Sequence, residues 1–380
     1  MRLEEYLKNK YIAGDVSVEY RAFGEIYDNT KAMYYSFNVG EKTYRVFAFI
    51  SVPKTKKPKS GYPAVVLMHG GNGAAYYEFT QKWAEKGYVA IAPDYNAKCG
   101  ENLGNRNIAN EQGGPVGYGF SGIDTDEPWT FFSTLSSMKA IDALCGMDIV
   151  NKNKIFTVGL SWGGVLNFML MSQDKRVTAG SIIYSAAYAF NGDYGKPILD
   201  GMPEDVAKNY FDNIEPTSYL NKITCPVLFT AGTQDHAFKM NNRQYTADKI
   251  SGKPYYALRE DFYHGNFYGF EQNESVEFFD ALCGKKAVPQ PKAAILGNGM
   301  IKVKAFSKDS ELKLVYTVKD LDSAKFCKWK AVRIESGDVT QLPENHTAFF
   351  VNEKLADGTI WSTKVFFNGS GKRYTTRNGQ

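Results

Sequence analysis

Short apolar runs alternate with helical segments through the middle of this chain, and that alternation constrains its fold more than any other feature. The runs have the composition of strands buried on both faces, and they are PAVVLMHGG, YVAIAPDY, KIFTVGL, VTAGSIIYS and PVLFTAG. Helical patterns separate them at residues 76–86, 129–145, from 162 onward and at 241–250, and the strand PYYALRE and a helix at 275–283 complete the series. This order is the one that a mostly parallel sheet covered by helices on both faces requires, and it predicts that fold.

Segments of a different kind flank and interrupt this series. Residues 16–53 alternate in polarity between turn signals, which predicts antiparallel strands. Residues 96–128 and 186–222 are long insertions that are rich in Gly and Asn or contain Pro. Long loops in compact domains are usually functional, so we expect both insertions to border the active site.

The C-terminal quarter has another character. After Cys283 a basic, proline-containing linker, GKKAVPQPKAA, leads to strand-like runs alone, which are MIKVKAF, ELKLVYTV, CKWKAVRIE, HTAFFVNE and TIWSTKVFF. Period-two alternation of this kind predicts a small β-sandwich. The 380 residues are therefore predicted to form an α/β catalytic domain at 1–285 and an all-β sandwich domain at 286–380.

Charge divides near the same boundary. Residues 285–380 contain 17 Lys and Arg and 9 Asp and Glu, a net charge of +8, which leaves −4 for residues 1–284. The C-terminal lysines alternate with apolar residues, as in IKVK at 301–304, which is typical of half-exposed strands, so we expect no nucleic-acid partner. No apolar run reaches eighteen residues, so we expect no membrane partner or membrane span.

The cysteines and the first residues narrow the class further. The five cysteines are widely spaced and form no C-x-x-C pair, which argues against a disulfide framework and a zinc ribbon, and we expect no metal and no cofactor. The opening MRLEEYLKNKYIAGD carries acidic residues at Glu4 and Glu5 and lacks the apolar run of a signal peptide. We therefore expect a cytoplasmic protein, or a secreted or periplasmic one if a leader was trimmed.

The sharpest chemical signal is the segment GLSWGG at residues 159–164, which lies between the strand KIFTVGL and a helix. A nucleophile elbow needs small residues beside the serine, because the serine occupies a tight and strained turn between a strand and a helix. The N-terminal dipole of the following helix also favours negative charge beside Ser161. This setting predicts that Ser161 is a catalytic nucleophile, whereas an ordinary Gly-rich turn is the alternative.

A serine nucleophile needs a histidine base, and the chain has four candidates. His69 lies upstream of the serine and His346 lies in the predicted β-domain. His236 directly follows a strand, whereas His264 lies in REDFYHGN, between the last strand and the last helix of the α/β domain. We choose His264 over His236, because a loop in that position can carry the base to the serine.

The base in turn needs a carboxylate that holds its tautomer and stabilises the imidazolium. Asp235 lies in TAGTQDHAF, just beyond the strand PVLFTAG and 29 residues before His264. The order nucleophile, acid, base is one that serine hydrolases use. Asp261 and Glu260 are closer to the histidine in sequence and are kept as reserve candidates for the acid.

Backbone N–H groups must stabilise the tetrahedral oxyanion. The first is expected from Trp162, the residue after the nucleophile. The second is expected from the glycine-rich loop HGGNG, with Gly71 as the first choice and Asn72 as the second. His69 is expected to support this loop through hydrogen bonds rather than to take part in catalysis.

Aromatic residues in or beside the two insertions are candidates for the substrate pocket, above all Trp129, Tyr184 and Tyr188. They suit stacking on a sugar or phenolic face, and packing of the insertions onto the core would explain them equally well. The acidic run at 124–127 lacks the spacing of a calcium loop, which favours a solvated loop over a cation site.

These motifs, in this order and spacing, resemble those of the dienelactone-hydrolase-like and acetyl xylan esterase-like branch of the α/β-hydrolases. The resemblance covers about residues 40–284. It implies an eight-stranded sheet, a metal-independent Ser-Asp-His mechanism and hydrolysis of short acyl esters, often acetyl groups on plant polysaccharide side chains. Two departures concern the elbow: dienelactone hydrolases proper use cysteine where this chain has Ser161, and cephalosporin-deacetylating esterases usually have glutamine where it has Trp162. The C-terminal segment loosely resembles the β-domain appended to some bacterial esterase-like proteins.

We therefore expect a serine carboxylic ester hydrolase that removes acetyl or other short acyl groups from carbohydrate or small-molecule esters. Two alternatives stay open at this point. One is a peptidase of the prolyl-oligopeptidase type, which shares the order of the triad but usually carries a propeller domain or its equivalent. The other is a non-catalytic binding protein in which the basic β-domain does the binding. A homo-oligomer is possible under each hypothesis.

Overall fold

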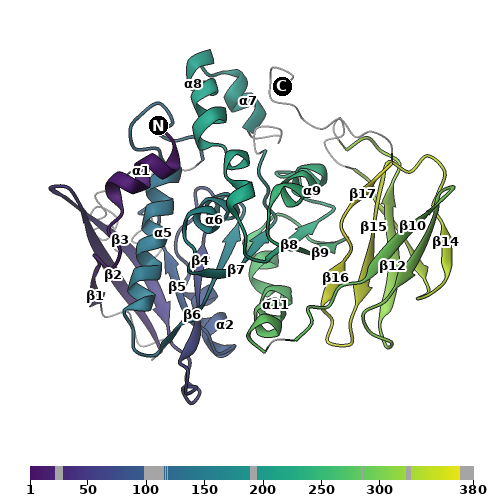
Figure 1. Cartoon of the computed structure of the whole chain (residues 1–380), viewed down its shortest axis with the longest axis horizontal. Helices are drawn as coiled ribbons and strands as arrows, with labels where there is room; N and C mark the ends of the chain where they lie inside the picture. The colour runs from purple at the N-terminus through teal and green to yellow at the C-terminus, as the bar shows by residue number, and fades with distance from the viewer. Residues whose placement is uncertain are drawn as a thin grey trace. The chain divides into compact units, whose positions relative to one another are not determined.

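The computed structural model describes residues 1–21, 29–97, 115, 117, 119–188, 195–284, 286–321 and 327–368. Most of the first predicted insertion therefore lies outside the described residues. Within the described residues the chain forms two compact units (Figure 1). The first unit comprises Met1–Ala187, Pro197–Val227 and Ile250–Lys253, and the second comprises Tyr188–Lys196, Leu228–Lys249 and Pro254–Gln380.

The elements follow one another along the chain in the alternation that the sequence predicts. Up to residue 222 they are α1 (Leu3–Lys10), β1 (Ser17–Arg21), β2 (Thr30–Val39), β3 (Lys42–Ser51), β4 (Tyr62–Met68), α2 (Tyr77–Glu85), β5 (Val89–Pro93), α5 (Trp129–Cys145), β6 (Val150–Leu160), α6 (Trp162–Gln173), β7 (Val177–Ile183), α7 (Gly195–Asp200), α8 (Glu204–Asn209), the π-helix η2 (Tyr210–Ile214) and the 3₁₀ helices η3 (Pro216–Ser218) and η4 (Leu220–Lys222).

The remaining elements are β8 (Val227–Gly232), α9 (Met240–Lys249), β9 (Pro254–Arg259), α10 (Asn266–Glu271), α11 (Glu274–Cys283), β10 (Lys292–Gly297), β11 (Met300–Lys304), β12 (Glu311–Thr317), β13 (Lys330–Ile334), β14 (Val339–Gln341), β15 (Ala348–Lys354), β16 (Ile360–Ser362) and β17 (Phe366–Phe367).

The first unit is built on a mixed sheet with the strand order β1-β2-β3-β5-β4-β6-β7. β1, β2, β3 and β5 pair in antiparallel fashion in that order, whereas β4 pairs in parallel with β5 and β6, and β6 in parallel with β7. β4, β5 and β7 are almost wholly buried, and β6 is buried from Ile155 to Leu160, as their continuous apolar sequences predict. The carboxyl ends of β4 and β6 therefore meet at one edge of the sheet, where the HGGNG loop and Ser161 follow.

Helices α5 and α6 form the interior of the helical layer. They pack against each other and against β6, and α1 and η4 contact their other sides, whereas α2 packs against β3 and β5. All but one of the 17 residues of α5 are buried, because the helix is enclosed on every side. The short α1 was not predicted, although Leu3, Tyr6 and Leu7 give it a buried stripe at helical spacing.

The second unit continues from β8 and β9 into the C-terminal strands, in the order β8-β9-β16-β15-β12-β13. β16 is antiparallel to β9, with Ser362 opposite Tyr256, and the Ser362 hydroxyl accepts a hydrogen bond from the N–H of Leu258 at 2.8 Å. The buried carboxylate of Glu274 in α11 accepts the N–H of Ile360 at 2.9 Å. The strands beyond residue 286 therefore share a sheet with the last strands of the α/β region. The domain boundary at 285/286 stays a prediction.

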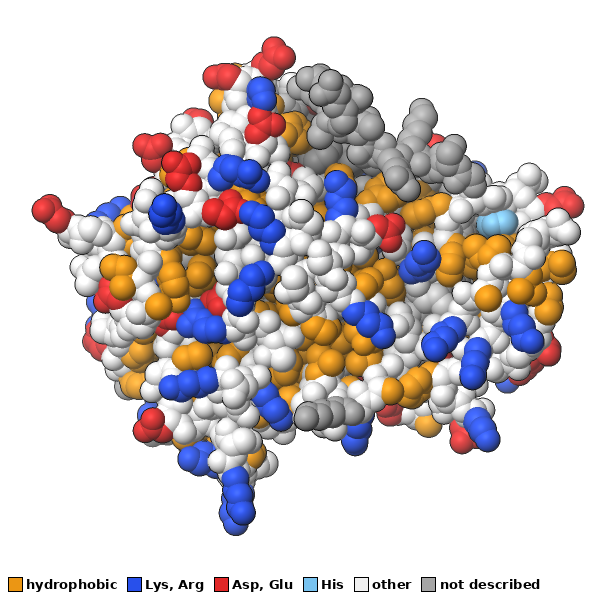
Figure 2. Space-filling model, viewed as in Figure 1, with side chains coloured by type: hydrophobic (Ala, Val, Ile, Leu, Met, Phe, Trp, Pro, Cys, Tyr) orange, Lys and Arg blue, Asp and Glu red, His pale blue; other side chains and the backbone are white. Residues whose placement is uncertain are grey.

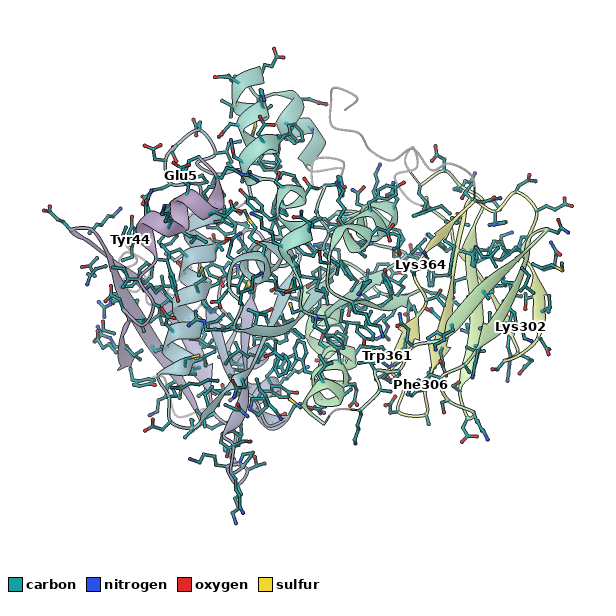
Figure 3. The ribbon with its side chains drawn as sticks, viewed as in Figure 1. Glu5, Tyr44, Lys302, Phe306, Trp361 and Lys364 are labelled. Carbon is teal, nitrogen blue, oxygen red and sulfur yellow. The ribbon has the colours of Figure 1, made fainter. Side chains whose placement is uncertain are left out.

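A β-sandwich lies within this unit, as the sequence predicts. The three-stranded sheet β10-β11-β14 faces the antiparallel strands β12, β13 and β15. Their shared core is formed by buried side chains of both sheets, which are Ile301, Val303, Leu312, Leu314, Ile334, Leu342, Phe349 and Val351. Lys302 lies on the outer face of β11, whereas Trp361 of β16 is fully buried (Figure 3). β10 begins at Lys292, within the last three residues of the predicted linker GKKAVPQPKAA.

The distribution of charge on the C-terminal strands fits half-exposed sheets. In β11, Lys302 and Lys304 are exposed between the buried residues Ile301 and Val303. On the face shown in Figure 2, the lysine and arginine side chains of this region stand apart from one another among other side chains. No helix within the described residues is long and apolar enough to cross a membrane.

Candidate active site

Ser161 occupies the strained turn that a nucleophile elbow requires. It lies between the end of β6 and the start of α6, with φ 54° and ψ −121°. A non-glycine residue at positive φ is uncommon and costs conformational energy, so the surrounding contacts must hold it there. Its N–H donates to the carbonyl of Ile183 at the end of β7 at 3.0 Å, and its carbonyl accepts the N–H of Gly164 at 2.8 Å.

Three glycines beside Ser161 permit this turn, because each lies where a side chain would collide with the backbone or a neighbour. A Cβ at Gly159 would lie 2.7 Å from the Cα of Gly164, and one at Gly163 would lie 2.6 Å from the carbonyl oxygen of His69. A Cβ at Gly164 would lie 2.7 Å from the Oγ of Ser185. The small residues of GLSWGG are thus required by close packing of β6, α6 and the loop after β4.

The HGGNG loop after β4 lies directly against the serine. A Cβ at Gly70 would be 3.2 Å from the Cβ of Ser161 and 3.7 Å from its Oγ. Gly71, the residue chosen for the oxyanion hole, follows at once, and Asn72, the second choice, is exposed and has φ 56°. The structure therefore brings the loop and the Trp162 end of α6 together around Ser161. The roles of Gly71, Asn72 and Trp162 as oxyanion donors stay predictions.

His69 holds this loop in shape. Its ring is buried, its Nε2 accepts the N–H of Tyr95 at 3.0 Å, and its Nδ1 lies 2.8 Å from the carbonyl oxygen of Gly70. Because Nε2 is an acceptor, the proton must lie on Nδ1, which donates to Gly70. The side-chain amide of Asn96 adds a hydrogen bond to the carbonyl of Gly73 at 2.9 Å.

The indole of Trp162 packs on the described part of the first insertion. The Phe120 ring meets it edge to face at 5.4 Å between centroids and also contacts Tyr210 at 4.9 Å. Gly119 has φ 54°, and a Cβ there would lie 2.8 Å from the Trp162 ring. The side chain after the nucleophile thus packs against residues 119–120, and Phe120 in turn contacts η2. That the insertions border the active site stays a prediction.

The second unit carries Asp235 and His264. Nδ1 of His264 lies 3.0 Å from Oδ1 of Asp235. The same carboxylate oxygen accepts the N–H groups of Ala237 at 2.8 Å and Phe238 at 3.2 Å. The Asp235 side chain is fully buried, whereas the side chain of His264 is 17% exposed. The structure thus joins two of the three predicted catalytic residues within one unit, and Ser161 belongs to the other.

A buried arginine, which the sequence analysis did not single out, completes this group. Arg243 of α9 forms an ion pair with Oδ2 of Asp235. Burial alone would raise the pKa of Asp235, but the charge of Arg243 and the hydrogen bond from His264 outweigh it and hold that pKa below its ordinary value. Burial also lowers the pKa of Arg243, against the opposing effect of Asp235. Asp235 is therefore ionised at neutral pH.

The loop that carries His264 is placed by a close approach to β8. Gly232 ends β8, and a Cβ there would lie 2.5 Å from the carbonyl carbon of Phe262 and 2.8 Å from its Cβ. The hydroxyl of Thr233 donates to the carbonyl of Glu260 at 2.9 Å. The ring of Phe238 stacks near that of His264, with centroids 6.1 Å apart and planes 14° apart.

The reserve candidates lie elsewhere in this unit. The carboxylate of Asp261 is 80% exposed and lies 4.0 Å from Arg259, and that of Glu260 lies 3.8 Å from Lys313. His236 neighbours His264, with ring centroids 5.7 Å apart. His346 bonds through Nδ1 to the carbonyl of Pro343 at 2.8 Å, in the sandwich. Of the carboxylates considered for the catalytic acid, Asp235 is the one whose hydrogen bond to His264 is described above.

The three predicted pocket residues are buried. Trp129 and Tyr184 are at most 1% exposed, and Tyr188 is 6% exposed. The indole N–H of Trp129 donates to the carbonyl of Tyr95 at 3.1 Å, while Tyr184 and Tyr188 have φ values of 38° and 62°. The low exposure of these rings is explained by packing within the protein. Their contact with substrate stays a prediction.

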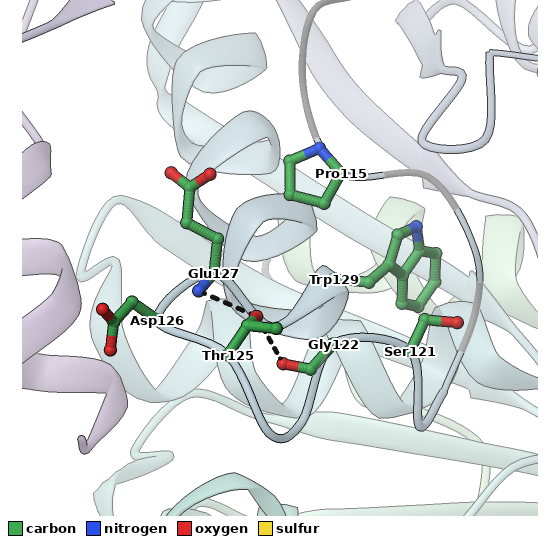
Figure 4. Close-up of a pocket in the computed structure, with 7 residues that line it drawn as sticks. All are labelled: Pro115, Ser121, Gly122, Thr125, Asp126, Glu127 and Trp129. Atoms are coloured by element: carbon green, nitrogen blue, oxygen red, sulfur yellow. Dashed lines mark hydrogen bonds between the residues drawn. The ribbon is translucent and has the colours of Figure 1, made fainter.

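The acidic run at 124–127 borders a hollow of about 420 Å³ (Figure 4). The Thr125 hydroxyl donates to the carbonyl of Gly122 at 2.7 Å and accepts the N–H of Glu127 at 3.2 Å. Glu127 forms an ion pair with Lys10 at 2.5 Å. Ser161, Asp235 and His264 do not line this hollow. In the described part of the chain no three His, Cys, Asp or Glu side chains gather as metal ligands would.

The strand order and the elbow together define an α/β-hydrolase, and comparison with solved structures agrees. An acetyl xylan esterase from Paenibacillus sp. R4 matches with a TM-score of 0.57 at 17% identity, over 73% of this chain and 92% of its own. Acetyl xylan esterase 1 from Thermoanaerobacterium sp. JW/SL YS485 matches with a TM-score of 0.57 at 15% identity, over 73% and 91%. An acylaminoacyl peptidase from Pyrococcus horikoshii gives 0.50 at 14% identity, over 69% of this chain and 42% of its own.

The sequence profile of the dienelactone hydrolase family matches residues 48–288. The chain therefore belongs to the dienelactone hydrolase family. A search of curated protein sequences returns no match. The matched range includes the HGGNG loop, the elbow, Asp235 and His264, and it ends where the C-terminal strands begin. Family and fold together make this protein a hydrolase of the esterase type.

Proposed function

We propose that this protein is a serine carboxylic ester hydrolase that works through an acyl-enzyme on Ser161. The observation that carries the proposal is the backbone of Ser161, which is held at positive φ between β6 and the N-terminus of α6. Strain of this kind persists only where the surrounding structure enforces it, and it collects at functional sites. The hydrogen-bonded pair of His264 and the buried Asp235 supports the same reading, because a serine nucleophile needs a base and an acid that orients it.

In the proposed mechanism His264 accepts the proton of the Ser161 hydroxyl while Oγ attacks the ester carbonyl. The resulting oxyanion is stabilised by the N–H of Trp162 and by the N–H of Gly71 or Asn72. The intermediate collapses, the C–O bond to the alcohol breaks, and the imidazolium gives its proton to the leaving alkoxide. A water molecule, deprotonated by His264, then hydrolyses the acyl-enzyme and restores Ser161. Asp235 stays ionised throughout and stabilises the imidazolium.

The proposed substrates are acetyl or other short acyl esters of a carbohydrate or a small molecule. Two acetyl xylan esterases share the fold, and membership of the dienelactone hydrolase family is consistent with ester chemistry. A serine peptidase is the alternative, because an acylaminoacyl peptidase shares the fold as well. The two differ in the leaving group, an alcohol or an amine, and the assay below separates them.

The test is hydrolysis of acetyl, butyryl and feruloyl esters and of a proline amide by the purified full chain. We expect the acetyl ester to be cleaved fastest, and we expect Ser161→Ala to lose at least about 10³-fold in kcat. Ser251→Ala is the matched control, because Ser251 is an exposed serine whose hydroxyl donates to the carbonyl of Asn221. Ester cleavage that survives in Ser161→Ala would refute the mechanism, and faster cleavage of the amide would identify a peptidase.

A further inference from the structure

Arg243 stands behind the predicted catalytic acid. It lies in the first turn of α9, its side chain is only 3% exposed, and its Nη2 pairs with Oδ2 of Asp235. The other carboxylate oxygen, Oδ1, receives His264 and the N–H groups of Ala237 and Phe238. The two oxygens thus have separate tasks. Oδ1 faces the histidine and its own loop, whereas Oδ2 pairs with Arg243 of α9.

Stability does not explain an arginine at this position. No described group accepts a hydrogen bond from its Nε or Nη1, although both atoms are buried. Buried donors without partners destabilise a fold, and a buried ion pair is often no more stable than a well-packed apolar pair of similar size. A methionine or leucine opposite an apolar residue would fill the same space without these penalties. The presence of an arginine at this position is therefore better explained by its effect on Asp235.

We propose that Arg243 is a positioning residue for catalysis, which fixes the rotation of the Asp235 carboxylate so that Oδ1 points to Nδ1 of His264. This inference rests on the proposed function, because it assigns His264 as the base. The charge of Arg243 has a second effect. It neutralises part of the charge of Asp235, so the pair of Asp235 and His264 holds a proton less tightly than it would beside a bare carboxylate.

The groups that face this pair come from two segments, α9 and the loop between β8 and α9. Arg243 approaches from α9 and the His236 ring from the loop after β8, while Phe238 stacks beside His264 and carries no charge. Arg243 is thus a permanent cation in direct contact with Asp235. Without it the imidazolium is favoured, so the base becomes available only at higher pH. The midpoint of the acid limb of the kcat/KM profile should move upward.

The experiment compares Arg243→Met, Arg243→Lys and Lys249→Met in the full chain, with a p-nitrophenyl acetate assay from pH 5 to pH 10. For Arg243→Met we expect kcat to fall by about 10- to 100-fold with little change in KM, and the acid limb to move up by about one pH unit. Arg243→Lys keeps the charge, so its acid limb should stay in place while kcat falls. Lys249 is an exposed lysine on the same helix, so Lys249→Met is the control for loss of one charge.

Three results would overturn the inference. The first is a folded Arg243→Met with an unmoved acid limb, which would leave Arg243 a structural residue. The second is wild-type kcat in either Arg243 variant. If Arg243→Met does not fold, the third is an acid limb that moves in Arg243→Lys, because that variant retains the cation. Ser161→Ala is measured in the same assay. Full activity in Ser161→Ala would refute the proposed function, whereas any of the three results above beside an inactive Ser161→Ala would refute only the role of Arg243.

Discussion

Gly232→Ala tests how the structure places the histidine. The new Cβ would lie 2.5 Å from the carbonyl carbon of Phe262, where ordinary contacts begin near 3.4 Å. The loop must therefore retreat from β8 by about 1 Å, and it carries His264 two residues further on. A displacement of about 1 Å in a catalytic group costs about 10²-fold in rate. We expect kcat/KM for p-nitrophenyl acetate to fall about 100-fold, which corresponds to about 2.7 kcal/mol in the barrier.

The same substitution should destabilise the fold by about 1–3 kcal/mol, the usual effect of overpacking, so thermal unfolding is measured alongside the kinetics. The matched control is Gly146→Ala. Gly146 follows α5 with φ −73°, and a Cβ there meets its nearest neighbour, the carbonyl oxygen of Ala143, at 3.4 Å. It should keep wild-type activity. A Gly232→Ala enzyme that is folded and fully active would show that contact between β8 and the Phe262 loop does not set the position of His264.

Two further predictions concern stability. Burial raises the pKa of Glu274 above its ordinary value, against the opposing effect of Arg259. The folded protein therefore holds the proton of the Glu274 carboxyl group more tightly than the unfolded chain does. Its stability falls as pH rises through the raised pKa. Glu274→Gln should therefore gain in Tm relative to wild type from pH 4.5 to pH 7, and parallel curves would contradict this. A chain that ends at residue 285 would expose the edge of β9 that β16 covers and should aggregate or lose cooperative unfolding; a soluble, active fragment with a wild-type Tm would contradict this.

Much of the fold could be predicted because its signals are local. The helix at 129–145 has the predicted bounds in the structure, and the strands around the elbow differ from prediction by a few residues. The elbow is visible because a strained serine needs small neighbours, and those neighbours are glycines in the sequence. The spacing of Asp235 and His264 after their strands identified a pair that the structure joins by a hydrogen bond.

The parts that sequence reasoning missed depend on contacts between distant segments. Arg243 lies in a polar helix, MNNRQYTADK, whose buried face is itself polar, so no hydrophobic period marks it. The run TIWSTKVFF indicates one strand, but residues 363–365 fall outside strand structure and divide it into β16 and β17, which both pair with β15. The need for glycine at 232 depends on Phe262, and nothing in the local sequence indicates that approach.

The pairing of β16 with β9 has a consequence for how the chain is made. Arg259 ends β9, and Ile360 begins its sheet neighbour 101 residues later. At a synthesis rate of about 5–20 residues per second, roughly 5–20 seconds separate the two. Throughout that interval the growing chain has an open strand edge beside the segment that carries His264. Native closure of this edge must therefore wait until Ile360–Ser362 have been synthesised, and a chaperone that shields exposed strands would act in that window.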